Sequence, residues 1–214
     1  MEHGDTTVKR RTYRSELRRQ RADQSRASVV SAAAELFLRD GYTATTIAAV
    51  AAQAGVSVET IYKGFGGKAG LVRAIWERGL AGRGPVHAED RSDALRELGD
   101  AGALIDGWSR LTSEVSPRVA PITLLVKGAA GSDTELAALD REMDADRLER
   151  MTDNARALIQ IGGLRAGIGL QEVADVLWTA SSPQLYELLV LRRGWPLHRY
   201  SAFVASTMKA ALRD

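Results

Sequence analysis

The chain of 214 residues contains no cysteine, which excludes disulfides, zinc–thiolate sites, iron–sulfur clusters and cysteine nucleophiles. Its only histidines, His3, His87 and His198, are too far apart in sequence to suggest a metal site or a catalytic triad. No apolar run approaches the roughly 18 residues of a membrane-spanning helix, and the charged N-terminus lacks the apolar core of a signal peptide. We therefore expect a cytoplasmic protein with no membrane partner, metal, cofactor or catalytic residues.

Acidic residues are scarce in the first part of the chain. Residues 1–84 carry 14 Lys and Arg against 8 Asp and Glu, a balance of +6, whereas residues 85–214 carry 15 against 19, a balance of −4. An apolar content of 45% is ample for a buried core. The basic part has the charge that phosphate neutralisation and steering toward nucleic acid require.

The segment Thr45–Phe65 has the pattern of two short helices joined by a tight turn. The first helix is expected to begin near Thr46, with Thr45 as its cap, and to end at Gly55, where a turn between steeply crossing helices favours positive φ. Its inner face carries Ile47, Val50, Ala51 and Ala54 at helical spacing.

The second helix of this pair is expected to start at Ser57, a good N-cap, and to bury Ile61 and Phe65. Its outward residues would then be Val58, Glu59, Thr60, Tyr62 and Lys63. Such an arrangement is typical of a DNA-binding helix-turn-helix, although an ordinary helical hairpin has a similar pattern.

The flanking segments extend this pattern, and residues 25–81 resemble the tetracycline-repressor (TetR) family of bacterial regulators in register. The matching residues are Leu36, Phe37, Gly41, Tyr42, Thr45, Thr46, Ile47, Ala51, Gly55, Val56, Ser57, Thr60, Tyr62, Phe65 and Lys68. The resemblance implies that Thr60 and Lys63 read bases, with Ser57, Val58 and Glu59 contributing at the groove. It also implies that Thr46, Tyr62 and Lys68 bind phosphates.

Three glycines depart from the family pattern: Gly64, Gly67 and Gly70. Gly67 can still act as an N-cap, whereas Gly70 inside the next helix costs about 0.5–1 kcal/mol relative to alanine. The resulting hypothesis is a loosely formed helix start that weakens the grip of Lys68 on DNA. On this hypothesis Gly70→Ala should tighten operator binding.

Basic residues are densest between Lys9 and Arg26, and residues 1–24 are expected to form a mobile basic arm. Such an arm can lie along the DNA backbone or enter the minor groove. The alternative is a solvated tail that only aids solubility. Residues 25–84 would form the helix-turn-helix domain, beginning with a helix from Ser25 to about Asp40.

Glycine and proline at Gly82, Gly84 and Pro85 mark a boundary, after which residues 85–214 are predicted to be entirely helical. The predicted helices are 90–115, 118–130, 133–161, 171–181, 183–193 and 197–212. For the third of them we expect Ser132 and Glu135 to form a capping box and Gly162 to end it. The acidic residues Asp140, Glu142, Asp144 and Asp146 resemble the start of a calcium loop, but its sixth position is Ala145 rather than glycine and its twelfth is Met151 rather than glutamate. With Arg141, Arg147 and Arg150 they indicate a solvated helix face.

The resemblance implies that this second, larger domain pairs two subunits and senses a small molecule. The last two helical segments, 171–193 and 197–212, would form the dimer contact, and apolar pocket residues would line the sensor site. The candidate dimer residues are Leu185, Leu188, Leu189, Phe203, Val204 and Met208. The candidate pocket residues are Trp108, Leu111, Leu124, Leu125, Met143, Met151, Leu158 and Trp178.

The sequence therefore predicts an all-α protein with an N-terminal three-helix helix-turn-helix domain followed by a larger helical domain for ligand binding and dimerisation. We expect a homodimeric repressor that binds a palindromic double-stranded DNA operator and is released by a small-molecule effector. Two alternatives remain at this point. One is an enzyme that borrows a helix-turn-helix head, and the other is a helical oligomer whose head binds protein.

Overall fold

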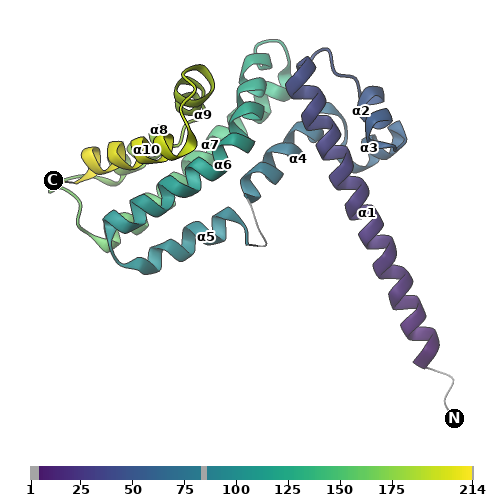
Figure 1. Cartoon of the computed structure of the whole chain (residues 1–214), viewed down its shortest axis with the longest axis horizontal. Helices are drawn as coiled ribbons and strands as arrows, with labels where there is room; N and C mark the ends of the chain where they lie inside the picture. The colour runs from purple at the N-terminus through teal and green to yellow at the C-terminus, as the bar shows by residue number, and fades with distance from the viewer. Residues whose placement is uncertain (1–4, 83–85, 214) are drawn as a thin grey trace. The chain divides into compact units, whose positions relative to one another are not determined.

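The computed structural model describes residues 5–82 and 86–213, with side chains from Glu16 onward, and all regular structure in these ranges is helical (Figure 1). The predicted all-α fold is confirmed. His3, Gly84 and Pro85 lie outside the described residues. The elements are α1 (Asp5–Asp40), α2 (Ile47–Ala54), α3 (Val58–Phe65), α4 (Lys68–Ala81), α5 (Ala88–Ala94), η1 (Leu95–Leu98), α6 (Ala101–Ala129), α7 (Thr134–Ile161), α8 (Leu170–Ala180), α9 (Pro183–Tyr186), η2 (Glu187–Arg192) and α10 (Leu197–Leu212).

The chain divides into two compact units, Met1–Ile75 and Trp76–Asp214. The division lies within α4 rather than at the glycine- and proline-rich boundary expected around Gly82. The reason is the packing of the end of α4: Gly79 lies so close to α6 that a Cβ there would be 2.9 Å from Val119. The last turns of α4 therefore belong to the second unit, which we call the body; the first unit is the head.

The head is built on α1, a single helix of 36 residues. The sequence predicted this helix only from Ser25, whereas residues 5–24, which were expected to form an arm, are helical as well. No glycine or proline occurs between Asp5 and Asp40, and arginine, leucine, glutamine and alanine favour the helix throughout. Figure 1 shows α2 and α3 beside the C-terminal half of α1. The buried residues of α1 include Val29, Val30, Ala33, Leu36 and Phe37.

The cap of α2 is Thr46 rather than the predicted Thr45. Thr46 is the N-cap, because its hydroxyl accepts a hydrogen bond from the Ala49 N–H at 3.1 Å. Thr45 is buried, and its hydroxyl approaches the carbonyl oxygens of Gly41 at 2.8 Å and Leu36 at 3.2 Å. Thr45 thus holds the loop onto the end of α1. Gly55 ends α2 with φ of 69°, the left-handed conformation that the turn was expected to require.

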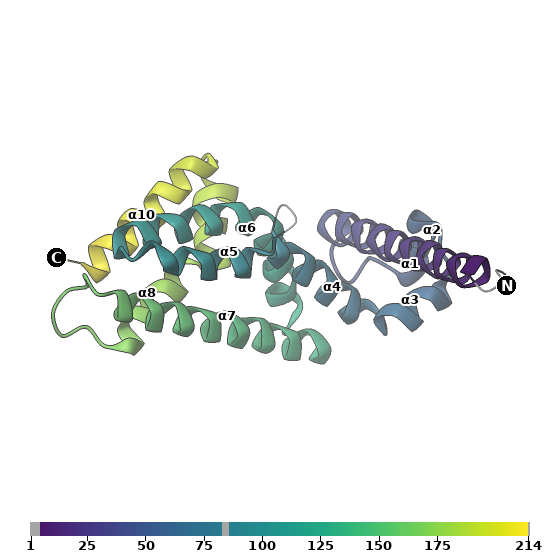
Figure 2. The same cartoon turned by 90° about the horizontal axis from the view of Figure 1, so that it is seen from below.

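The body is assembled around two long helices, α6 and α7 (Figure 2). Helix α10 packs on α6 and α8, α8 packs on α7, and α5 packs on α6. The core of the body is apolar, and α6, α7, α8 and α10 contribute fully buried residues to it. Among them are Leu104, Ile105, Leu158, Val173, Leu177, Tyr200, Val204 and Leu212.

Several helix ends in the body differ from the prediction. The expected helix 90–115 is interrupted because Gly99 adopts φ of 66° and Asp100 caps a new helix, accepting from the Ala103 N–H at 2.7 Å. That new helix, α6, then continues through Pro117, although a break had been expected between residues 115 and 118, and it also contains Pro121. A proline removes one backbone hydrogen bond but does not end a helix that packing holds on both sides.

The cap of α7 is Asp133, whose carboxylate accepts from the N–H groups of Glu135 and Leu136 at 2.9 and 3.0 Å. Ser132, the predicted cap, instead donates its hydroxyl to the Ala129 carbonyl. The predicted stop at Gly162 is confirmed by its φ of 82°. None of the described helices is long and apolar enough to cross a membrane.

Candidate nucleic-acid interface and ligand cavity

Helix α3 of the head buries one residue and exposes the rest of its first two turns. Ile61 is fully buried, which anchors the helix in the head core. The Ser57 hydroxyl caps the helix by accepting from the Thr60 N–H at 3.1 Å, and it lies 2.8 Å from the Thr60 hydroxyl. The predicted outward residues Val58, Glu59, Thr60, Tyr62 and Lys63 are all exposed.

The interface continues at the start of α4, where Lys68 is held in a defined place. Its ammonium nitrogen lies 4.2 Å from the centre of the Tyr42 ring, and Tyr42 itself stacks on Phe37 at 5.6 Å. A cation over an aromatic face is stabilised by the ring quadrupole. Lys68 is thus positioned where the positive end of α4 also favours an anion.

Gly70 was expected to loosen this helix start, and the structure gives it a different role. A Cβ on Gly70 would lie 1.7 Å from the carbonyl oxygen of Phe65. The first turn of α4 therefore approaches the end of α3 too closely for any side chain. This close contact argues against a loosely formed helix start, and a methyl group at position 70 would disturb the start of α4 rather than firm it.

Arg26 has a structural role that the sequence did not reveal. It was noted only as the last of the closely spaced basic residues from Lys9 onward, but its guanidinium donates to the Gly64 carbonyl at 3.1 Å and stacks 4.5 Å from the centre of the Phe65 ring. Both partners lie at the C-terminal end of α3, where a cation is favoured by the helix dipole. Arg26 therefore links α1 to the exposed helix of the motif.

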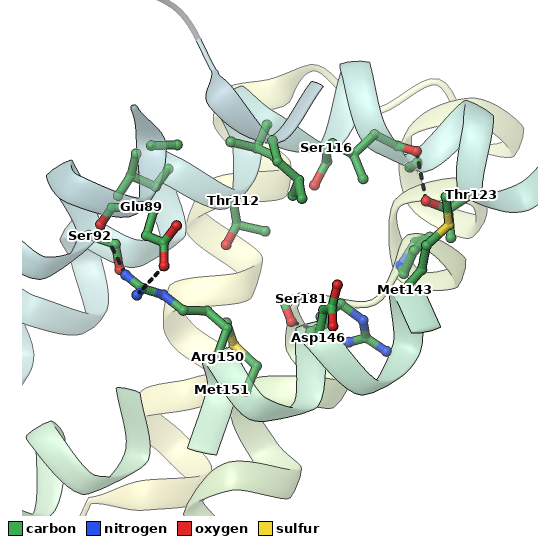
Figure 3. Close-up of a pocket in the computed structure, with 18 of the residues that line it drawn as sticks. Glu89, Ser92, Thr112, Ser116, Thr123, Met143, Asp146, Arg150, Met151 and Ser181 are labelled. Atoms are coloured by element: carbon green, nitrogen blue, oxygen red, sulfur yellow. Dashed lines mark hydrogen bonds and ion pairs between the residues drawn. The ribbon is translucent and has the colours of Figure 1, made fainter. Parts of the chain in front are cut away.

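The body contains a cavity of about 590 Å³ that is lined by side chains from α4 to α10. Four of the eight predicted pocket residues line it: Trp108, Leu111, Met143 and Met151. The other four do not. Leu158 is fully buried in the body core, and Trp178 packs beneath Arg147; Leu124 and Leu125 are half-buried elsewhere on α6. Figure 3 shows the cavity with Thr112 and Ser116 on one side and Met143 and Met151 among the residues around it.

The cavity wall also carries two arginines that were expected on a solvated helix face. Arg147 and Arg150 have side chains only 18% and 23% exposed. Arg147 stacks on the Trp178 ring at 4.3 Å, donates to the Trp178 carbonyl and lies 3.4 Å from Asp144. Burial lowers the pKa of Arg147, partly offset by Asp144. The two arginines share one face of α7 with Met143 and Met151. Because the two methionines were predicted to line the pocket, this helical spacing could have placed the arginines there as well.

Arg150 is engaged on the opposite side of the cavity. Its guanidinium contacts the carboxylates of Glu89 at 3.2 Å and Asp93 at 2.7 Å, and it donates to the Glu89 carbonyl at 3.0 Å. The dashed lines on Arg150 in Figure 3 mark its contacts with this segment. These contacts join α5 to α7 across one end of the cavity.

A family model described as bacterial regulatory proteins of the tetR family matches residues 29–75. This segment includes the C-terminal part of α1, all of α2 and α3, and the start of α4. The matched part of the head is a TetR-family DNA-binding region. The chain is also similar to the HTH-type transcriptional regulator YvkB of Bacillus subtilis, with 34% identity over 70 residues. This match covers 33% of this chain and 37% of that relative.

Solved TetR-type structures share the whole fold. SmeT, the repressor of a Stenotrophomonas maltophilia multidrug efflux pump, in its complex with triclosan is 19% identical with a TM-score of 0.69; the match covers 89% of this chain and 92% of SmeT. A TetR-family regulator structure from Syntrophomonas wolfei is 20% identical with a TM-score of 0.68, covering 88% and 95% of the two chains. At these identities the likeness shows the fold alone.

The six residues predicted for a TetR-type dimer contact separate into three groups. Val204 and Met208 are buried in the body core, and Met208 also lines the cavity, so neither is available to a partner. Their side of α10 faces α6 and α8, which the periodicity alone did not reveal. Leu188 is 51% and Phe203 is 37% exposed. The remaining two, Leu185 and Leu189, are half-buried.

Proposed function

We propose that this protein is a TetR-family regulator, a homodimeric repressor that binds a palindromic DNA operator and leaves it when a small molecule occupies the cavity of the body. The observation that carries the DNA-binding part is the division of α3. One side is anchored by the fully buried Ile61, and the other presents five exposed residues capable of contacting DNA. Second helices of such motifs enter the major groove with their N-terminal residues near the bases.

The proposed roles within the interface follow from position. Thr60 and Lys63 reach base edges, and Ser57, Val58 and Glu59 contribute at the groove. Thr46, Tyr62 and Lys68 bind phosphates and thereby fix the register of α3. The contact between Lys68 and Tyr42 supports its role because a cation already held in place loses little side-chain freedom on binding a phosphate.

The homodimer is proposed to form through η2 and the outer face of α10. This face has exposed, uncharged residues in Ala202, Phe203, Ser206, Thr207 and Ala210, and η2 adds the exposed Leu188 and Leu191. Phe203 packs edge-on against Trp195 at 5.6 Å, which gives the surface a rigid aromatic centre. A second copy covers it by two-fold symmetry, and two heads then read two half-sites.

Ligand control is proposed to act through the population of two forms of the dimer. One form places both α3 helices in successive major grooves, and the ligand fits the other form better. Shifting the population from 1:99 to 99:1 takes roughly a 10⁴-fold difference in affinity. Helix α4 supports this proposal, since it carries Lys68 in its first turn and Trp76, Glu77 and Leu80 in the cavity wall.

Selection of bound fragments from a random DNA pool by the full-length protein tests the proposal. We expect a palindrome whose half-sites lie about one helical turn apart, with two chains bound per duplex. Binding of the selected duplex should weaken steeply with salt, because phosphate contacts release counterions. A single asymmetric half-site would contradict dimeric reading. Failure to bind any duplex would favour a head that binds protein.

A further inference from the structure

We propose that the cavity of the body selects an apolar organic cation. This inference rests on the proposed function, in which that cavity holds the effector, and it assigns the chemical class of the effector. Two features of the cavity carry it: a wall that is largely apolar and aromatic, and a charge balance that leaves two carboxylates without a cationic partner.

The size and wall of the cavity fit a drug-sized apolar molecule. Its volume of about 590 Å³ lies within the range of about 300–1,000 Å³ that is usual for such sites. Trp76 and Trp108 contribute aromatic surface, and Met143, Met151 and Met208 contribute adaptable thioethers. The Trp108 N–H already donates to the Ser92 carbonyl at 3.3 Å, so the ring offers a ligand only its apolar and π surface. Tryptophan rings attract organic cations.

The arginines of the wall are already engaged and do not form an anion site. Arg147 is stacked on Trp178 and paired with Asp144, which also lies 3.3 Å from Lys127. Arg150 is held between the carboxylates of Glu89 and Asp93, as described above. An anionic ligand would have to compete for these arginines with the carboxylates that already contact them.

The carboxylates of the wall outnumber its cations. Glu77, Glu89, Asp144 and Asp146 line the cavity, together with the guanidinium groups of only Arg147 and Arg150. Once the two arginine pairs are formed, Glu77 on α4 and Asp146 on α7 make no hydrogen bond or ion pair within the described parts of the chain. Figure 3 shows Asp146 across the open space from Thr112 and Ser116. The lining therefore has two carboxylates more than it has guanidinium groups.

A cation in the cavity therefore meets aromatic surface and complementary charge without breaking a pre-existing ion pair. A neutral molecule of the same shape gains the apolar contacts alone. An anion meets the same apolar surface and the repulsion of Glu77 and Asp146. The expected order of affinity is cation, then neutral molecule, then anion.

Three probes of similar shape and different charge test this order on the full-length protein: tetraphenylphosphonium, triphenylphosphine oxide and tetraphenylborate. Binding is measured by isothermal titration calorimetry in the absence of DNA. We expect tetraphenylphosphonium to bind at least about tenfold more tightly than tetraphenylborate, because repulsion and attraction at a partly solvated site each change affinity severalfold. Equal binding of the two ions, or preference for the borate, would overturn the proposal.

Single substitutions of the two carboxylates test whether they cause the preference for the cation. Asp146→Asn and Glu77→Gln should each weaken tetraphenylphosphonium by about threefold to tenfold and leave triphenylphosphine oxide unchanged, since only a partly screened charge is removed. Glu149→Gln is the matched control, because Glu149 is exposed on the same helix as Asp146 and does not line the cavity. An equal loss in the control would mean that net charge rather than the cavity attracts the cation, and would contradict the proposal.

A separate DNA-binding measurement distinguishes this inference from the proposed function. If tetraphenylphosphonium binds with the expected selectivity but does not reduce operator binding, the cavity selects cations and the effector mechanism is wrong. If tetraphenylborate binds preferentially and releases the operator, the effector mechanism stands and the cation inference is wrong.

Discussion

The head presents its candidate functional side chains on its own surface, whereas the body encloses its candidates around a cavity. The head places them on the outside of α3, within the eight residues Val58–Phe65, with Lys68 a few residues later. The body places them on the inside, where α4 through α10 each contribute to one cavity. A surface on one short helix is set by local signals, such as the Ser57 cap and the Gly55 turn. A cavity depends on how distant segments pack, so its composition is decided only by the whole body.

The sharpest test of the two-sided α3 compares substitutions on its opposite faces. Ile61→Ala should lower the free energy of unfolding by about 2–5 kcal/mol, because it removes buried methyl groups and leaves a cavity in the head. Val58→Ala, on the exposed face, should change it by less than about 0.5 kcal/mol while weakening operator binding. Urea unfolding followed by circular dichroism measures the first effect and gel-shift titration the second. Similar losses of stability for both variants would show that α3 is not divided in this way.

Two glycines of the head, Gly64 and Gly70, lie six positions apart and should respond to alanine in opposite ways. Gly70→Ala should destabilise the head by about 1–3 kcal/mol, since the new methyl group overlaps the Phe65 carbonyl and the backbone has to shift. Gly64→Ala should instead raise stability by about 0.5–1 kcal/mol, because Gly64 is helical and its Cβ position is open. Thermal unfolding of both variants measures these two changes in stability. A more stable Gly70→Ala protein would restore the interpretation of Gly70 as a merely loose helix position.

Lys63 and Lys68 separate base reading from phosphate binding within the interface. Lys63→Ala should lower specific operator binding by about 1–3 kcal/mol, whereas Lys68→Ala should weaken operator and random DNA alike and reduce the salt slope by about one unit. Fluorescence anisotropy titrations on both duplexes at several salt concentrations measure the two losses. If each variant lost the same affinity on operator and random DNA, this division of roles would be wrong.

The features that could be predicted from the sequence are those set by residues close together in the chain. Features that depend on contacts between distant residues could not. Ser57, Gly55 and the outward face of α3 were predictable, because capping, positive φ and helical spacing involve residues within a few positions of one another. Gly70 was misjudged, because its constraint is the carbonyl of Phe65 in the preceding helix. In the body, the residues of α7 were predicted in part, but Arg147 and Arg150 acquire partners, Trp178 and Glu89, that lie far away in sequence.

Tyr200→Phe tests the packing of the body core, and its expected effect on stability at neutral pH is the smallest of those predicted. This side chain is fully buried against Tyr186, and its hydroxyl makes no hydrogen bond of standard geometry among the described residues, although the Ser116 side chain lies near enough to lower its pKa slightly. Tyr200→Phe should therefore leave the free energy of unfolding at pH 7 unchanged or raise it by up to about 1 kcal/mol, because an unpaired hydroxyl costs more to bury than a hydrogen. Urea unfolding at pH 7 measures this difference.

Alkaline pH turns the same substitution into a stronger test. Burial raises the pKa of Tyr200 from 10.0 to about 12, with a smaller opposing effect from Ser116. The folded state thus holds the phenolic proton more tightly than the unfolded state, so this contribution to stability is complete below pH 10 and is lost as the pH rises toward 12. Tyr200→Phe has no such proton, and its free energy of unfolding should fall less steeply over that interval. Parallel curves for the two proteins would mean that the Tyr200 hydroxyl is reached by water or a partner in solution, and that the body core is less closely packed there than the buried ring indicates.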